Sequence, residues 1–132
     1  MISDIQSRLE EIEDLKSVQL ADDLEENLIQ ELSLDNTKMP AALLYFGATK
    51  HQPNETKMYV RQQTLKSVVV LLYCPVADLD ALEDAVVRTV LGYCHTPGHT
   101  GMEAAGAVTA LVVGPVCIRR IEFTTRYLIS QQ

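Results

Sequence analysis

The stretch KMYVRQQTLKSVVVLLY, residues 57–73, decides the fold, because these seventeen residues contain neither glycine nor proline. Its first part, MYVRQQ, alternates between two sides of an extended chain, whereas VVVLLY is apolar on both sides. A strand that is apolar on both faces is typical of burial between two layers. We therefore predict one long strand, or a strand with a bulge. Its far end is buried, and its near end forms a projecting arm that needs a neighbour.

Apolar residues at helical spacing predict helices on both sides of this strand. The first helix is marked by Ile2, Ile5, Leu9 and Ile12. A second helical pattern is marked by Leu24, Leu28 and Leu32, and its first turn carries the carboxylates of Asp22, Asp23, Glu25 and Glu26. These paired carboxylates are interpreted as a solvated helix start rather than as catalytic groups.

A third helix is predicted after Pro75, capped by Asp78 or Asp80 and running to about Leu91. Asp80 and Glu83 have the spacing of a capping box. The predicted buried stripe of this helix consists of Leu79, Leu82, Val86, Val90 and Leu91. Gly92 then stands where a helix commonly ends with a residue of positive φ.

Further strands complete an α+β fold. Pro40 opens the apolar run ALLYFGA, and residues 48–56 are expected to form a polar loop. Ala107–Val113 is apolar, and Val116–Ser130 alternates between apolar and polar residues, which indicates one buried face. The order is ααβββαββ or ααββαββ. It predicts one domain over residues 1–132, with a mainly antiparallel central sheet and helices packed on it.

Net charge, cysteine count and the length of the apolar runs exclude some partners and some cellular locations. The formal charge of −7 argues against binding to a nucleic-acid backbone, although an acidic surface could still let DNA slide past. Three cysteines at irregular spacing favour a reducing compartment over a disulfide framework. The acidic N-terminus does not resemble a signal peptide, and no apolar run is long enough to cross a membrane. These features predict a soluble protein that is intracellular where it is made.

The segment GYCHTPGHTG, residues 92–101, is the strongest candidate for a metal site. Cys94, His95 and His99 could supply three zinc ligands, with Glu103 as the nearest carboxylate. No second ligand pair with a short gap exists, and the HExxH, HxE…CxxC, GxSxG, GxxxxGK(S/T) and GxGxxG signatures are not present. The preferred interpretation is a solvated connection, with no metal, no cofactor and no enzymatic activity. A small metal-dependent enzyme built on residues 92–103 remains the alternative.

Two cysteines and one polar segment within the predicted strands also lead to predictions. Cys74 and Cys117 fall in apolar strand patterns and are expected to be inert core thiols. Arg61, Gln62 and Gln63 interrupt the long strand. Either they form an exposed strand face, or the Arg61 guanidinium makes a polar contact with a neighbouring subunit. The pattern leaves both readings open.

The order of these features resembles the tail terminator proteins of Mu-like contractile-tailed phages. The resemblance runs from about Ile2 to Ser130 and rests on order and spacing. The stretches that carry it are MISDIQSRLEEI, KSVQLADDLEENL, MPAALLYF, YVRQQTLKSVVVLLY, DLDALEDAVVRTVLGY and RIEFTTRYLIS. It implies a structural virion protein, assembled in the host cytoplasm, that forms a six-membered ring at the neck-proximal end of the tail.

The resemblance also implies a set of partners. Such a ring caps the tail tube protein, ends growth of the tube and, where present, of the sheath, and meets the neck or connector protein. DNA passes through it without specific binding. A neck or head–tail joining protein of the same particle is the alternative. The residues predicted to contact other subunits or the tube are His51, Asn54, Glu55, Tyr59, Arg61, Gln62, Gln63 and Arg126.

Overall fold

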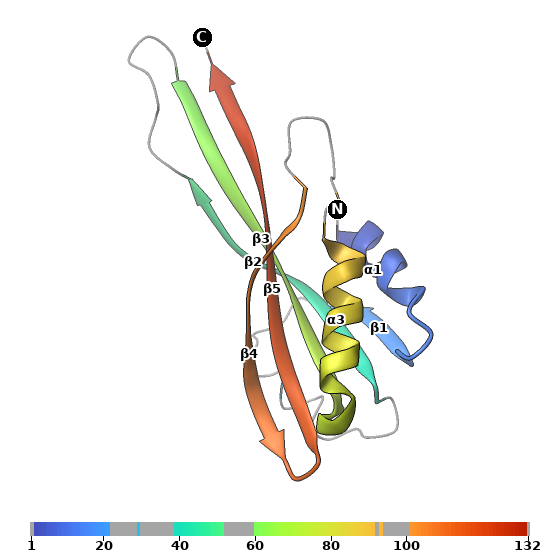
Figure 1. The fold of residues 1–132 in the computed structure, drawn as a ribbon. Coiled ribbons are helices and arrows are strands. Elements are labelled where there is room, and N and C mark those ends of the chain that lie inside the picture. The colour runs from blue at the N-terminus through green and yellow to red at the C-terminus, as the bar shows by residue number, and fades with distance from the viewer. Residues whose placement is uncertain are drawn as a thin grey trace.

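The computed structural model describes residues 2–21, 29, 39–51, 60–91, 93 and 101–131, without the side chains of residues 2, 48–51, 60–64, 113 and 127–131. The elements are α1 (Ile2–Glu10), β1 (Ser17–Leu20), β2 (Ala41–His51), β3 (Val60–Pro75), the 3₁₀ turn η1 (Val76–Asp78), α3 (Leu79–Val90), β4 (Glu103–Val113) and β5 (Val116–Gln131). Figure 1 shows their arrangement around one sheet. The predicted α+β class is confirmed.

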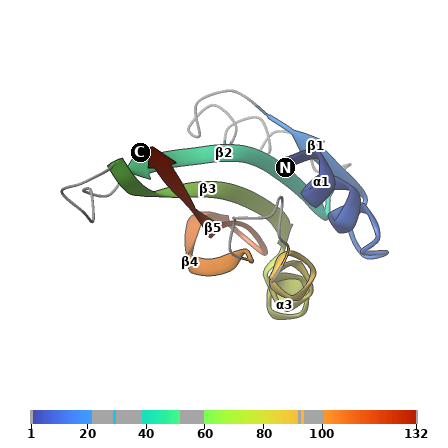
Figure 2. The same ribbon diagram turned by 90° about the horizontal axis from the view of Figure 1, so that it is seen from above.

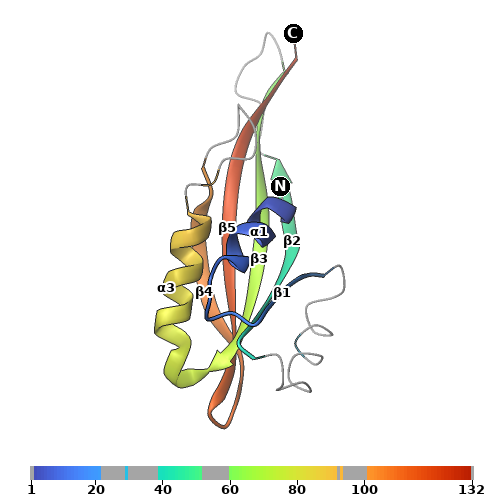
Figure 3. The same cartoon turned by 90° about the vertical axis from the view of Figure 1, so that its right-hand side faces the viewer.

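The described strands form one five-stranded sheet in the order β1-β2-β3-β5-β4. The short β1 runs parallel to β2, and every other neighbouring pair is antiparallel. Figure 2 shows that the sheet is curved when it is seen from above. Helices α1 and α3 lie side by side on the same face of the sheet (Figure 3). The predicted antiparallel sheet with helices packed on it is therefore correct.

The apolar half of β3 lies at the centre of the molecule, as its sequence predicts. The five residues Val68–Leu72 are all fully buried. Because successive strand side chains point to opposite faces, Val68, Val70 and Leu72 join the cluster beneath α1 and α3. Val69 and Leu71 join a second cluster on the other face, with Leu43, Tyr45, Tyr73 and Ile118. The strand is buried between two apolar layers for this reason.

Helix α3 follows its predicted stripe except at its end. Leu82, Val86 and Val90 are buried against the sheet. The helix ends at Val90, and Leu91 already has an extended backbone, with φ −58° and ψ 132°. Its side chain is half exposed, so the expectation that Leu91 belongs to the buried stripe is wrong. Gly92 lies outside the described residues.

The predicted side-chain cap of α3 is absent. Asp78 occupies the position before the helix, but its side chain makes no capping hydrogen bond. The preceding 3₁₀ turn gives Asp78 a helical backbone, with φ −99° and ψ −2°, whereas a capping residue normally has an extended one. Asp80 lies inside the first turn of the helix, and the Glu83 carboxylate contacts Arg119 on β5.

The N-terminal half contains two further corrections. Strand β1 was not predicted, because it has four residues and only Val18 is buried. The loop predicted at residues 48–56 begins later than expected. β2 continues to His51 after a register shift between Phe46 and Thr49, and His51 pairs with Thr64. The predicted helix over Leu24, Leu28 and Leu32 lies outside the described residues, apart from the helical Ile29.

Candidate assembly surface

Strands β3 and β5 pair over their whole length and extend beyond their neighbours. Their register runs without a shift from Val60↔Gln131 to Pro75↔Val116. The pairing of β2 ends at His51↔Thr64, and the pairing of β4 begins at Glu103↔Thr124. Within the described residues, β3 residues 60–63 and β5 residues 128–131 thus form a two-stranded ribbon, visible at the top of Figure 1.

This ribbon brings together several residues predicted to contact other subunits. Arg61, Gln62 and Gln63 lie on the ribbon, opposite Ser130, Ile129 and Leu128. His51 ends β2 beside the base of the ribbon, and Arg126 pairs with Leu65 one step further along β3. The Arg126 side chain is exposed. These five residues therefore share one end of the sheet, although they come from three strands.

The other three predicted contact residues cannot be placed on this surface. Asn54, Glu55 and Tyr59 lie outside the described residues. The same holds for Cys94, His95 and His99, the candidate zinc ligands. Among the residues that the structure describes, no group of three metal-ligating side chains gathers. Glu103 is described, and it is an exposed residue at the start of β4.

The edge strand β4 is a second surface feature, which the sequence did not single out. Its eleven residues, EAAGAVTALVV, carry one charge, and within the described residues it pairs only with β5. Val108 and Val112 are well exposed. Edge strands of this kind can accept a further strand, and natural proteins commonly protect them with lysine, proline or bulges. Register shifts at Ala104/Gly106 and Thr109/Leu111 provide such protection here.

Two small hollows lie on the described surface. One of about 280 Å³ lies between the start of α3 and the α1–β1 connection, and Asp14, Pro40, Asp78, Ala81 and Leu82 line it. Another, of about 150 Å³, lies along β4 and β5 beside Arg120 and Glu122. Ligand pockets commonly measure about 300–1,000 Å³. Neither hollow reaches that range.

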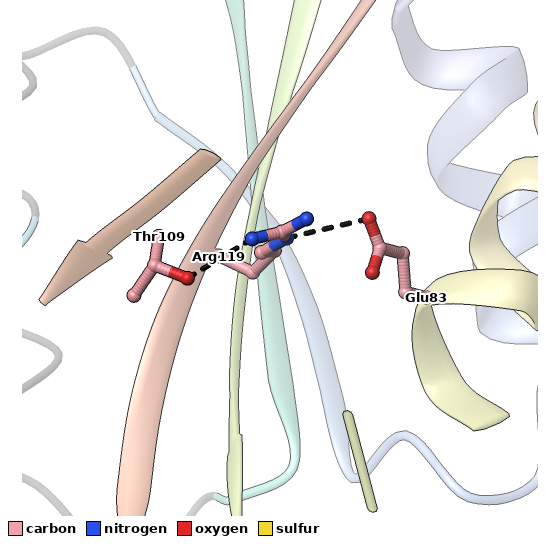
Figure 4. Close-up of polar contacts among 3 residues, drawn as sticks. All are labelled: Glu83, Thr109 and Arg119. Atoms are coloured by element: carbon pink, nitrogen blue, oxygen red, sulfur yellow. Dashed lines mark hydrogen bonds and ion pairs between the residues drawn. The ribbon is translucent and has the colours of Figure 1, made fainter. Parts of the chain in front are cut away.

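Polar side chains brace both faces of the sheet near the edge. On the helix-covered face, the Arg119 guanidinium contacts Glu83 Oε1 of α3 at 3.3 Å and donates to Thr109 Oγ1 of β4 at 3.0 Å (Figure 4). On the opposite face, the Glu122 carboxylate accepts from Arg120 at 2.9 Å and from the Ser67 hydroxyl at 3.3 Å. These contacts hold α3 and β4 to the central strands.

A double-mutant cycle on Glu83 and Arg119 is expected to give a coupling free energy of about 1 kcal/mol, the upper end for surface pairs. The reason is partial burial, since the two side chains are only 22% and 25% exposed. The matched control is Asp84 with Arg88 on the same helix, at 62% and 79% exposure, where about 0.3 kcal/mol is expected. Urea unfolding of the alanine variants measures both; equal couplings would contradict the bracing role.

No protein-family model matches the chain, and no curated protein matches it either. Within the described residues, no helix is both long enough and apolar enough to cross a membrane.

Proposed function

We propose that this chain is a phage tail terminator. In this proposal six copies form a ring on the last ring of the tail tube, stop growth of the tube and of any sheath, and present their other face to the neck. The protein is then a structural part of the virion, at the neck-proximal end of the tail, without enzymatic activity. The order of sequence features supports this proposal, and the α+β fold is compatible with it.

The observation that carries the proposal is the ribbon formed by β3 and β5. A two-stranded ribbon has little apolar surface of its own to bury, and isolated hairpins are marginally stable in water. It extends past β2 and β4 and carries Arg61, Gln62 and Gln63. Among the described residues no third strand pairs with the ribbon, and a neighbouring subunit would supply one. Repeated between different surfaces of adjacent copies, such a contact closes into a ring when the rotation permits.

Charge supports the same proposal. The chain carries a formal charge of −7, so a ring of six would carry six times as much, −42. A channel lined by charges of one sign attracts molecules of the opposite charge and repels molecules of the same charge. An acidic ring repels the phosphate backbone, and this repulsion would let DNA pass without specific binding.

Loss of the protein during infection tests the proposal. With its gene disabled in the phage that encodes it, tails are expected to be overlong and variable in length in negative-stain electron micrographs. Supplying the intact chain in trans is expected to restore a single tail length. Tails of normal length that fail to join heads would contradict a terminator and would instead support a neck or head–tail joining protein.

A further inference from the structure

Two buried cysteines lie directly opposite each other on the central strands. Cys74 of β3 and Cys117 of β5 are register partners. Both thiols are free, with exposures of 0% and 3%, and both belong to the cluster beneath α3. The expectation that both lie in the core is confirmed, whereas their inertness stays a prediction that the proposal below limits to reducing conditions. Their direct opposition did not follow from the sequence, because 42 residues separate them along the chain.

The register gives the spacing of the two backbones. The Val76 N–H donates to the Pro115 carbonyl at 2.7 Å, which makes residues 76 and 115 a hydrogen-bonded pair. Hydrogen-bonded and non-hydrogen-bonded pairs alternate along an antiparallel ladder, so Cys74 and Cys117, two steps further, are also a hydrogen-bonded pair. The Cα atoms of such a pair lie about 5.5 Å apart. Disulfides are found at Cα separations of about 4.4–6.8 Å, so the two backbones are close enough. The Cβ atoms of directly opposite residues lie about 4.5–5.5 Å apart, so forming the bond draws the two strands slightly together.

The side chains also meet. Both cysteines belong to the cluster on the helix-covered face, and the Cys117 thiol is close enough to influence the ionisation of the Cys74 thiol. Burial, followed by the Cys117 thiol, raises the pKa of the Cys74 thiol to about 12. Because the thiolate is the reactive form, the pair stays reduced and slow to react while the fold is closed.

We propose that Cys74 and Cys117 form a latent disulfide site, which closes when the protein meets a low-molecular-weight disulfide outside a reducing compartment. A cysteine thiolate attacks the reagent, forms a mixed disulfide and releases one small thiol. The second cysteine then displaces the other small thiol and forms the protein S–S bond. The two protein thiols lose two protons and two electrons, and the reagent is reduced to two thiols.

The bond would join the end of β3 to the start of β5 covalently. It closes residues 75–116 into a loop that contains α3 and β4, and it joins β3 to β5 beneath the helix. A cross-link of this kind restricts the unfolded chain more than the folded one. The proposal does not depend on the terminator function. In a particle assembled in a reducing cytoplasm, the bond would form after release.

The test uses the full chain with Cys94→Ser, which removes the third thiol. This variant is denatured under reducing conditions and refolded with reduced and oxidised glutathione, so that burial does not limit access. The expected product has lost two hydrogen atoms, has no free thiol, and yields a peptide that links residues 74 and 117. Its melting temperature is expected to exceed that of the reduced protein.

The matched control carries Cys117→Ser in addition, so it cannot form a disulfide within the chain and can form only a mixed disulfide with glutathione or a bond between two chains. The proposal is overturned if the refolded Cys94→Ser protein keeps two free thiols. A glutathione adduct or a bond between two chains as the main product also overturns it. The same reagent applied to the folded protein is expected to give the same bond more slowly, because the closed fold shields both thiols.

Discussion

Replacing Phe123 by alanine is expected to lower the free energy of unfolding by about 3–5 kcal/mol, as is usual for a buried phenylalanine. Phe123 is 0% exposed and is among the largest fully buried side chains. It lies on β5 between Val68 of β3 and Ala104 of β4, beneath the helices. Its removal leaves a cavity that the paired strands cannot close. Urea unfolding followed by circular dichroism measures the loss.

The chain provides a matched control, because its other phenylalanine lies at the surface. Phe46 is 57% exposed, so Phe46→Ala removes the same atoms with little loss of buried contact. A change within about 1 kcal/mol is expected for it. Equal losses for the two variants would contradict the placement of Phe123 in the core.

Arg61→Glu is expected to prevent ring formation and leave the fold intact. Under the proposed function, the Arg61 guanidinium contacts a carboxylate or carbonyl oxygen of the neighbouring subunit. Reversing its charge replaces this attraction by repulsion at every contact of a closed ring. Analytical ultracentrifugation is expected to show a monomer for the variant and a six-membered species for the unaltered chain. Circular dichroism is expected to be unchanged.

Arg88→Glu is the control for net charge. Arg88 lies on the exposed side of α3 and pairs with Asp84. The variant changes the formal charge of the chain by the same two units as Arg61→Glu, at a position away from the ribbon. It is expected to form rings as the unaltered chain does. An Arg61→Glu protein that still closes rings at the same concentration would contradict the role assigned to this residue.

Some of the fold could be predicted because it depends on local patterns. The burial of Val68–Leu72 follows from an apolar run without breaks, and the stripe of α3 follows from helical spacing. Strand β1 could not be predicted in this way, because its four residues have one buried side chain. The predicted side-chain cap at Asp78 does not form, because the preceding 3₁₀ turn gives Asp78 a helical backbone. Residue spacing does not predict that turn.

The sheet order and the candidate surface depend on pairing between distant segments. Alternation shows which residues share a face, but it does not show that β5 lies between β3 and β4. The edge position of β4 among the described strands and the contact of Arg119 with Glu83 follow only from that order. The register likewise brings His51, Arg61 and Arg126 to one end of the sheet. Their role in subunit contacts stays a prediction.

Native mass spectrometry of the purified protein, with and without added zinc, tests the six-membered ring most directly. We expect a metal-free species of about 88 kDa, six times the 14.7 kDa of one chain. Adding zinc is expected to leave this mass unchanged. A monomer carrying one zinc ion would contradict the six-membered ring, and would assign the function to Cys94, His95 and His99 instead.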